Sequence, residues 1–255
     1  MPPQRFAFLA RPGTVPIAHR GGGLEAEENT LPAFARAVAL GYRDIELDVH
    51  ASRDGVVVVH HDDTLARMFG DPRAVAALDW AELATLRTPG GAAPPRLEDV
   101  LAAFPKVRFT IEVKAQAAAD PLARVIRAAG ALDRVCVGSF TPAFTAPVRK
   151  ALGPGLCWSP AHAGVARLWL AGWGLPFGAP APVVQVPMAF RGIPVVTPRF
   201  LRAAHARGVK VQVWTVNDAG LMDRLLDWGV DGIMTDRPTL LRARMQARGQ
   251  WPDRA

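Results

Sequence analysis

The sequence predicts an α/β protein, a (β/α)8 TIM barrel with a small insertion after the second strand. Short β-branched runs alternate with amphipathic helical patterns, and there are eight of each, which is the element count of such a barrel. The chain has 255 residues, 50% of them hydrophobic, which suits one barrel with one large core. Neither charge blocks nor low-complexity segments divide it. We therefore expect a single domain over residues 1–255.

The predicted strands are short segments rich in β-branched residues, the side chains that fit a buried parallel sheet. Each is followed by enough chain for a helix and a loop, as the parallel connections of a barrel require. The strands are predicted over residues 15–19, 44–50, 107–114, 134–139, 155–158, 183–186, 209–215 and 230–235.

The predicted helices start at capping signals and stop at glycines. Thr30 and Asp218 have side chains suited to an N-cap, prolines occupy several first turns, and glycines such as Gly41 follow last turns. The helices are predicted over residues 31–40, 97–104, 121–129, 142–152, 161–171, 198–207, 219–228 and 238–246.

Residues 50–96 form the predicted insertion, because this segment is too long for an ordinary barrel loop. Its apolar run is interrupted at Asp54-Gly55, a dipeptide typical of hairpin turns. We expect a small hairpin over residues 51–60, after which the second barrel helix begins near Leu97.

The charge, the cysteines and the N-terminal segment limit the expected partners, redox chemistry and location of the protein. The net charge of +7 favours anions such as phosphates, but the basic residues form no run, so we expect no nucleic-acid partner. Cys136 and Cys157 lack a CxxC pattern and are expected to be small core residues. The N-terminal segment lacks the apolar run of a secretory signal, so we expect a cytoplasmic location. The oligomeric state is not predicted.

Acidic side chains are concentrated on one face of the second predicted strand. Strand side chains alternate between faces, so the charged face of residues 44–50 carries Asp44, Glu46, Asp48 and His50. Neighbouring carboxylates repel one another unless water, protons or a cation offset their charge. This strand alone is compatible with a solvated face or with a metal site.

The third predicted strand favours the metal interpretation. Glu112 and Lys114 fall on the face opposite its apolar residues and, like Glu46 and Asp48, near the carboxyl end of a strand. The carboxyl ends of barrel strands converge on one mouth, where three carboxylates suit a hard divalent cation.

Three histidines near the same mouth are candidates for proton transfer. His19 ends the first strand, and His60 and His61 are adjacent. Because neighbouring strand residues point in opposite directions, only one of that pair should face the site, and the spacing does not choose between them. Arg20 and Lys114 would supply positive charge for a phosphate. The remaining histidines, His50, His162 and His205, are expected to be ordinary core or surface residues.

An ordered set of short segments resembles the glycerophosphodiester phosphodiesterase family. The resemblance covers about residues 15–240. The matching segments are His19-Arg20-Gly21, Glu28-Asn29-Thr30, Glu46-Leu47-Asp48-Val49, Asp54-Gly55 and His61-Asp62, followed by residues 111–114, 139–140, 213–217 and 232–238.

The resemblance implies a phosphodiesterase that cleaves glycerophosphodiesters to sn-glycerol 3-phosphate and an alcohol, and that requires one divalent cation, Mg²⁺ or Ca²⁺. It implies that His19 and His61 are the acid/base pair, which chooses His61 over His60. It further implies that Glu46, Asp48 and Glu112 are the metal ligands.

Further positions match family residues around the substrate. The resemblance places Arg20, Glu28 and Lys114 around phosphate and metal, and Trp214 at the substrate mouth. One departure is Glu27, where the family usually has proline before the Glu-Asn-Thr triplet. It leaves the roles of Glu25 and Glu27 open. Attack by water and attack by the glycerol hydroxyl, through a cyclic phosphate, are equally compatible with the sequence.

Two alternatives remain at this point. One is an enzyme similar to lysophospholipase D or sphingomyelinase D, and the other is a non-catalytic barrel that binds phosphodiesters. The apolar segment 168–182 bears on the first, because its Trp169, Trp173 and Phe177 either pack against the barrel or form a lip for a lipid that contacts a membrane transiently. We favour packing for the two tryptophans. Prolines and glycines in this segment exclude a membrane-spanning helix, so stable insertion is not expected.

Overall fold

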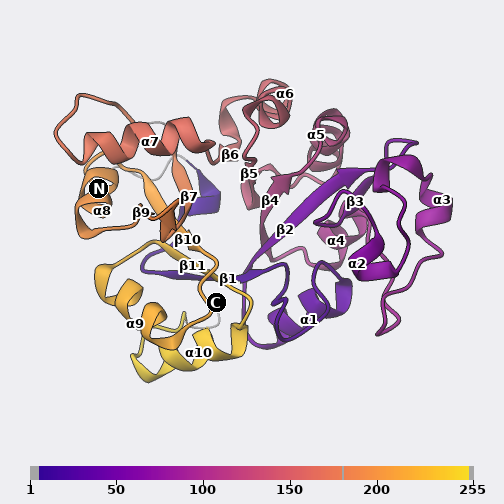
Figure 1. Cartoon of the computed structure of the whole chain (residues 1–255), viewed down its shortest axis with the longest axis horizontal. Helices are drawn as coiled ribbons and strands as arrows, with labels where there is room; N and C mark the ends of the chain where they lie inside the picture. Colours follow the sequence, from indigo (N-terminus) through magenta and orange to yellow (C-terminus); the bar gives the residue numbers. More distant parts are fainter. Residues whose placement is uncertain (1–5, 180, 253–255) are drawn as a thin grey trace.

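The computed structural model describes residues 6–179 and 181–252, and within them eight parallel strands form a nearly closed barrel surrounded by helices (Figure 1). The (β/α)8 fold predicted from the sequence is confirmed. The barrel strands are β1 (Val15–His19), β2 (Asp44–Ala51), β4 (Arg108–Val113), β5 (Val135–Gly138), β6 (Cys157–Trp158), β7 (Val183–Pro187), β10 (Lys210–Trp214) and β11 (Gly232–Thr235).

The surrounding helices agree closely with the predicted ranges. Thr30 and Asp218 cap their helices as expected, since their side chains accept hydrogen bonds from the backbone N–H groups of Ala33 and Leu221. The helices that follow the barrel strands are α1 (Leu31–Ala39), α4 (Leu97–Ala103), α5 (Ala119–Ala128), α6 (Pro142–Leu152), α7 (His162–Ala171), α8 (Pro198–His205), α9 (Ala219–Trp228) and α10 (Pro238–Ala247). Short 3-10 turns occur at Ala7–Leu9, Val75–Ala77, Gln116–Ala118, Leu132–Arg134 and Gly153–Gly155.

Neighbouring strands run in the order β6-β5-β4-β2-β1-β11-β10-β7. The register between β2 and β4 places Asp48 directly beside Glu112. The two ends of this order, β6 and β7, are joined by the backbone N–H of Gln185, which donates to Ser159 Oγ at 3.2 Å. Strand β6 is shorter than predicted because Gly153–Gly155 forms a 3-10 turn before it.

The segment between β2 and α4 contains further short elements on the outer side of β2 (Figure 1). Strand β3 (Val57–Val59) pairs antiparallel with the last residues of β2, and Gly55 turns the chain at φ +83°. The hairpin is therefore a continuation of the barrel strand itself. Helices α2 (Ala66–Phe69) and α3 (Trp80–Leu83) follow. A second hairpin, β8 (Ala189–Phe190) with β9 (Ile193–Pro194), follows β7 and was not predicted.

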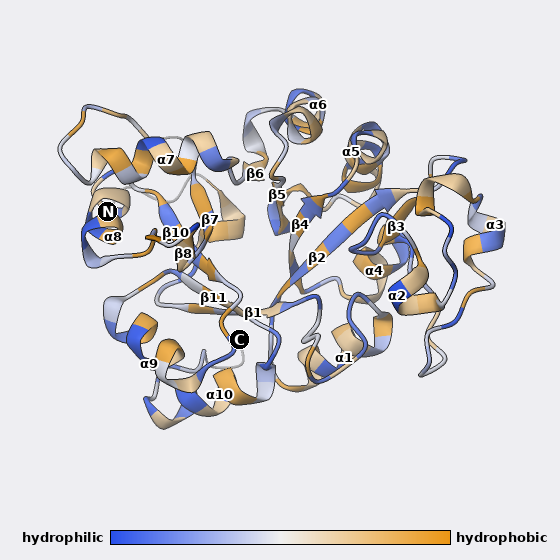
Figure 2. Ribbon diagram, viewed as in Figure 1, coloured by the Kyte–Doolittle hydropathy of each residue, from blue (hydrophilic) through white to orange (hydrophobic). Residues whose placement is uncertain are grey.

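The core lies mainly between the strands and the helices. Polar and apolar bands alternate along β2 (Figure 2), and its apolar residues, such as Leu47, pack in the same cluster as Phe109 and Ile111 of β4. Cys136 and Cys157 are buried in a smaller cluster with Phe8, Leu9 and Val183, so they are core residues as expected.

Among the described helices, none is long and apolar enough to cross a membrane. The cytoplasmic location and the single domain remain predictions. The domain prediction also covers residues 1–5, 180 and 253–255, which lie outside the described part of the chain.

Candidate active site

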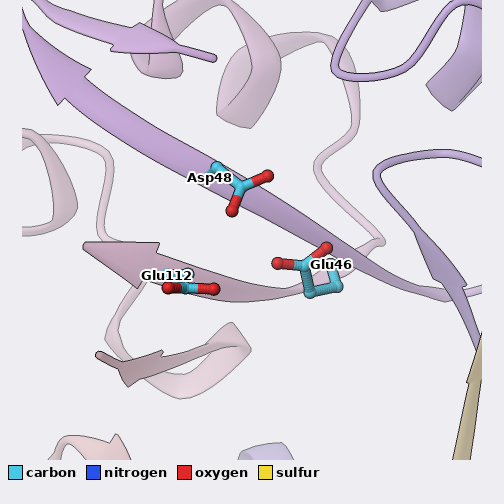
Figure 3. A group of neighbouring side chains, drawn as sticks. All are labelled: Glu46, Asp48 and Glu112. Carbon is cyan, nitrogen blue, oxygen red and sulfur yellow. The ribbon is translucent and has the colours of Figure 1, made fainter. Parts of the chain in front are cut away.

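Three carboxylates from two adjacent strands face one another at the carboxyl ends of the barrel strands (Figure 3). Glu46 and Asp48 come from β2 and Glu112 from β4, and each offers an oxygen within 4.8 Å of the others. The pleat explains this arrangement, because side chains two residues apart share a face and the register aligns Asp48 with Glu112.

The carboxylates form a mutually repelling group in which Glu46 and Asp48 are buried and Glu112 is partly buried. Burial and the neighbouring Asp48 raise the pKa of Glu46 to about 8. Burial, together with Asp48, also raises the pKa of Glu112. Asp48 is fully buried, and its Oδ1 has no hydrogen-bond partner within the described residues. A buried acceptor without a partner, beside two more carboxylates, fits a hard divalent cation with oxygen ligands.

Two basic side chains border the carboxylates. Lys114 Nζ lies 3.2 Å from Glu112 Oε1 and 3.6 Å from Asp48 Oδ1. Arg20 Nε lies 3.2 Å from Asp48 Oδ2, and the Arg20 backbone N–H donates to Glu46 Oε2 at 3.2 Å. Arg20 adopts φ +53°, in the left-handed region, which turns the chain sharply just after β1. Asn29 donates from Nδ2 to the same Oδ2 of Asp48 at 2.9 Å.

His19 is held by a carboxylate from the opposite end of the sequence. Its Nδ1 lies 2.6 Å from Asp236 Oδ1, and its Nε2 lies 3.7 Å from Glu46 Oε2. Asn217 donates from Nδ2 to the second oxygen of Asp236 at 2.9 Å. Burial lowers the pKa of His19, but Glu46 and Asp236 outweigh it, so the pKa is raised above its ordinary value. Strand neighbours explain the contact, because β1 pairs with β11, which ends just before Asp236.

His61 has a similar carboxylate partner. Its Nδ1 lies 2.6 Å from Asp62 Oδ1, and Arg67 Nε donates to the other oxygen of Asp62 at 2.7 Å. Arg67 also donates to Glu28 Oε1 at 2.6 Å, and the same oxygen accepts from Arg20 at 3.0 Å. Glu28 thereby links the His61 side of the site to the carboxylate side.

The adjacent His60 points elsewhere. It is 2% exposed, its Nε2 lies 3.0 Å from the carbonyl oxygen of Thr64, and its ring contacts Phe69. His61, by contrast, lines the cavity at the barrel mouth. The structure therefore brings His61 and not His60 to the site.

A cavity of about 610 Å³ opens at the barrel mouth, and its two sides differ in chemistry. One side holds the charged residues of β1, β2, β4 and the loops that follow them. We call it the charged half, and in the cavity it consists of His19, Arg20, Glu46, His61, Glu112 and Lys114. The other side is mostly apolar, and we call it the apolar half. It consists of Phe140, His162, Val165, Ala166, Trp169, Leu170, Phe190, Ile193, Val195 and Trp214.

Rings in contact run along the apolar half. Trp214, the predicted mouth residue, lies 5.6 Å from Phe140 between ring centroids, Phe140 lies 5.4 Å from His162, and His162 lies 5.0 Å from Phe190. His162 is a surface residue as expected, but it also lines the cavity. Trp169 is partly buried, lines the cavity and packs on the core. The expected packing of Trp173 is wrong, because this residue is 61% exposed.

Asp62, Asp236 and Arg67 were missed as individual site residues. Both aspartates occur in the matching sequence segments, and each follows the end of a strand. No pattern in the sequence points to Arg67. Phe190 was missed because its strand has only two residues and therefore no readable alternation.

Glu25 and Glu27, whose roles the sequence leaves open, bind loops. Glu25 accepts hydrogen bonds from the backbone and hydroxyl of Thr239 and pairs with Arg36. Glu27 accepts from Thr88 Oγ1 at 2.5 Å and from the backbone of Gly90 at 2.7 Å. These contacts give both glutamates a structural role beside the site.

Comparisons with known proteins agree with the geometry. Residues 19–240 match the sequence profile described as the glycerophosphoryl diester phosphodiesterase family. The chain belongs to this family. It is similar to a Mycobacterium tuberculosis protein named probable glycerophosphodiester phosphodiesterase 2, with 39% identity over 96% of this chain and 95% of that protein.

More distant relatives include other named activities. A lysophospholipase D of Rattus norvegicus is 28% identical over 89% of this chain and 84% of that protein. The crystal structure of glycerophosphodiester phosphodiesterase from Agrobacterium tumefaciens superposes with a TM-score of 0.75 at 26% identity, covering 90% of this chain and 99% of that one. Family membership confirms the predicted resemblance and the prediction of a phosphodiesterase, against the alternative of a non-catalytic barrel.

Proposed function

We propose that this protein hydrolyses glycerophosphodiesters to sn-glycerol 3-phosphate and an alcohol, with a divalent cation held by Glu46, Asp48 and Glu112. The observation that carries the proposal is the convergence of these carboxylates with two histidine–aspartate pairs at one end of a single cavity. The family membership and the name of the Mycobacterium relative support the substrate class.

A bound cation, Mg²⁺ or Ca²⁺, would polarise the phosphoryl oxygens as a Lewis acid. Lys114 and Arg20 lie beside the carboxylates and would bind the phosphate and offset its developing charge. Glu28 keeps the Arg20 guanidinium in place through the hydrogen bond to its Oε1. Trp214 would contact the substrate at the mouth.

The two histidines would move the protons. When His19 Nδ1–H donates to Asp236, its Nε2 is directed toward the cavity and is free to take or give a proton. His61 is arranged in the same way by Asp62. One histidine would deprotonate the attacking hydroxyl and the other would protonate the leaving alcohol. Water and the glycerol hydroxyl of the substrate are both suitable attackers in this arrangement.

Product analysis tests the proposal directly. Glycerophosphocholine is incubated with the metal-free protein, with Mg²⁺ and with Ca²⁺, and the products are separated. We expect choline and sn-glycerol 3-phosphate only when a cation is present. Release of glycerol and phosphocholine, or no release with either cation, would contradict the proposal.

The apolar half of the cavity favours a second candidate, hydrolysis of lysophospholipids. Water would add across the bond between phosphorus and the head-group oxygen, giving lysophosphatidate and the free alcohol. The acyl chain would lie against Val165, Ala166 and Trp169, since a polar glycerol needs no such surface. The name of the rat relative agrees with this candidate.

Two alanines of α7 provide a matched test. Both are exposed, but Ala166 lines the cavity and Ala163 does not. Ala166→Phe should lower kcat/KM for lysophosphatidylcholine relative to glycerophosphocholine, because the larger ring occupies the apolar half. Ala163→Phe should leave this ratio unchanged. If both variants keep the wild-type ratio, the acyl chain does not bind there.

A further inference from the structure

Apolar side chains are exposed on one face around the cavity mouth. The face consists of α7, residues 172–178 and the β8–β9 hairpin. Trp173 is 61% exposed, Leu175 44%, Phe190 44% and Ile193 56%. Large apolar residues so exposed rarely gather on a protein surface without a binding partner.

Contacts join these segments into one surface. Trp169 of α7 donates from Nε1 to the carbonyl oxygen of Pro194 in the hairpin at 3.1 Å. The same ring lies 5.8 Å from Trp173 between centroids. On the other side, Phe190 contacts His162 at the start of α7. Phe190, Ile193 and Trp169 also line the cavity, so the face is continuous with the apolar half of the site.

The charge of this part of the chain is one-sided. Residues 134–217 contain nine Lys or Arg and no Asp or Glu, whereas the rest of the chain contains 21 basic and 23 acidic residues. This segment therefore contributes +9, whereas the rest of the chain contributes −2, which together give the net charge of +7. The basic residues of this segment are spread along the sequence, but no acidic residues lie between them.

Arginines lie beside the exposed rings. The guanidinium carbon of Arg199 lies 4.0 Å from the Trp173 ring centroid, and that of Arg191 lies 5.5 Å from the Phe190 centroid. In the described part of the chain, neither arginine, nor Arg167 of α7, has a carboxylate within ion-pair distance. Aromatic rings bordered by unpaired arginines suit the head-group region of a membrane, where the rings contact lipid and the guanidinium groups contact phosphates.

We propose that this face docks on a lipid surface that contains anionic phospholipid. The cavity then opens toward the membrane, and a substrate with an acyl chain reaches the site without crossing water. The exposed rings supply the apolar contact, and the surplus of arginine supplies attraction to anionic head groups. Vesicle binding requires no turnover, so this proposal and the proposed reaction succeed or fail independently.

Vesicle sedimentation tests the docking. The full chain is mixed with phosphatidylcholine vesicles, with and without phosphatidylglycerol, and the bound fraction is measured at several salt concentrations. We expect stronger binding to the anionic vesicles and weakening by salt, because the Debye length falls to about 10 Å at 0.1 M. Absence of binding to anionic vesicles at low salt would overturn the proposal, as would equal binding to both kinds of vesicle.

Matched variants locate the surface. Arg191→Gln should weaken binding about fivefold, which corresponds to about 1 kcal/mol per basic residue at a membrane surface. Arg87→Gln is the control, because Arg87 is exposed and, among the described residues, donates only to the carbonyl oxygens of Ala84 and Leu86, outside this face. Ile193→Ser should also weaken binding, whereas Leu24→Ser, at a residue that is 61% exposed, should not. Equal losses in the test and control variants would contradict the assigned face.

Discussion

The charged and apolar halves of the barrel mouth border the same cavity but are organised in different ways. In the charged half, side chains are fixed one by one through short hydrogen bonds, as in His19 with Asp236 and His61 with Asp62. In the apolar half, aromatic rings pack in T-shaped or tilted arrangements, with centroids 5.0–5.6 Å apart. Directional bonds position reacting atoms, whereas apolar area favours any ligand of suitable shape. Substitutions should therefore abolish chemistry in the charged half and alter selectivity in the apolar half.

The largest effect is expected at the carboxylates. Glu46→Gln, Asp48→Asn and Glu112→Gln each preserve shape but remove a charged ligand. Residues that only hydrogen-bond to metal ligands typically contribute about 10- to 100-fold to metal affinity. Replacing a direct ligand should therefore lower cation affinity and turnover by more than about 100-fold. Calorimetric titration with Ca²⁺ or Mg²⁺ and a turnover assay measure the two losses. Variants that bind the cation as tightly as wild type would show that these residues are not its ligands.

Replacing His61 should impair turnover, whereas replacing the adjacent His60 should impair stability. His61→Ala should lower turnover by about 100-fold or more, the usual contribution of general acid/base catalysis. His60→Ala should instead lower the free energy of unfolding by about 1 to 3 kcal/mol, since it removes a buried hydrogen-bonding group. Turnover and urea unfolding are measured for both variants. A large loss of turnover in a folded His60→Ala variant would mean that His60 also serves the reaction, which would contradict the assignment.

Cation affinity should depend on pH in a defined direction. The pKa of Glu46 is raised to about 8 by burial and by Asp48 in the metal-free protein, so below this pH a proton occupies the carboxylate. The cation must displace that proton, and apparent affinity should rise about tenfold per pH unit from pH 6 toward pH 8, then level off. Titrations at three pH values measure the slope. A slope of zero would mean that Glu46 is already ionised.

Trp169 of α7 and Trp173, which follows this helix, sharpen the comparison at the edge of the apolar half. Trp169→Ala should lower the free energy of unfolding by about 2 kcal/mol, less than a fully buried tryptophan because this side chain is only partly buried. Trp173→Ala should change it by less than about 0.5 kcal/mol, because Trp173 is 61% exposed. Chemical unfolding of both variants gives the difference. Equal losses would mean that Trp173 belongs to the core.

The sequence predicts the charged half because its signals are local. Alternation along residues 44–50 is enough to bring Glu46 and Asp48 to one face. Because consecutive strands of a (β/α)8 barrel are neighbours, Glu112 of the next predicted barrel strand then lies beside them. The family segments then select His61. The contact between His19 and Asp236 joins residues at opposite ends of the chain, and it follows only once β1 and β11 close the barrel.

The apolar half was harder to predict because its elements are short and irregular. Strands β8 and β9 contain two residues each, so no alternation identifies Phe190 or Ile193 as lining residues. Trp169 and Trp173 match a helical spacing in the sequence, but α7 ends at Ala171, and the spacing does not tell which apolar side chains are covered. Tertiary contacts decide that Trp169 is partly buried and Trp173 is exposed.

The central claim is that the charged half hydrolyses phosphodiesters only with a divalent cation on its carboxylates. The most direct measurement is glycerophosphocholine turnover by the wild-type protein in excess chelator, followed by addition of Mg²⁺ or Ca²⁺ beyond the chelator's capacity. The structure predicts no turnover in chelator and recovery with the cation. Full turnover in excess chelator would contradict the claim.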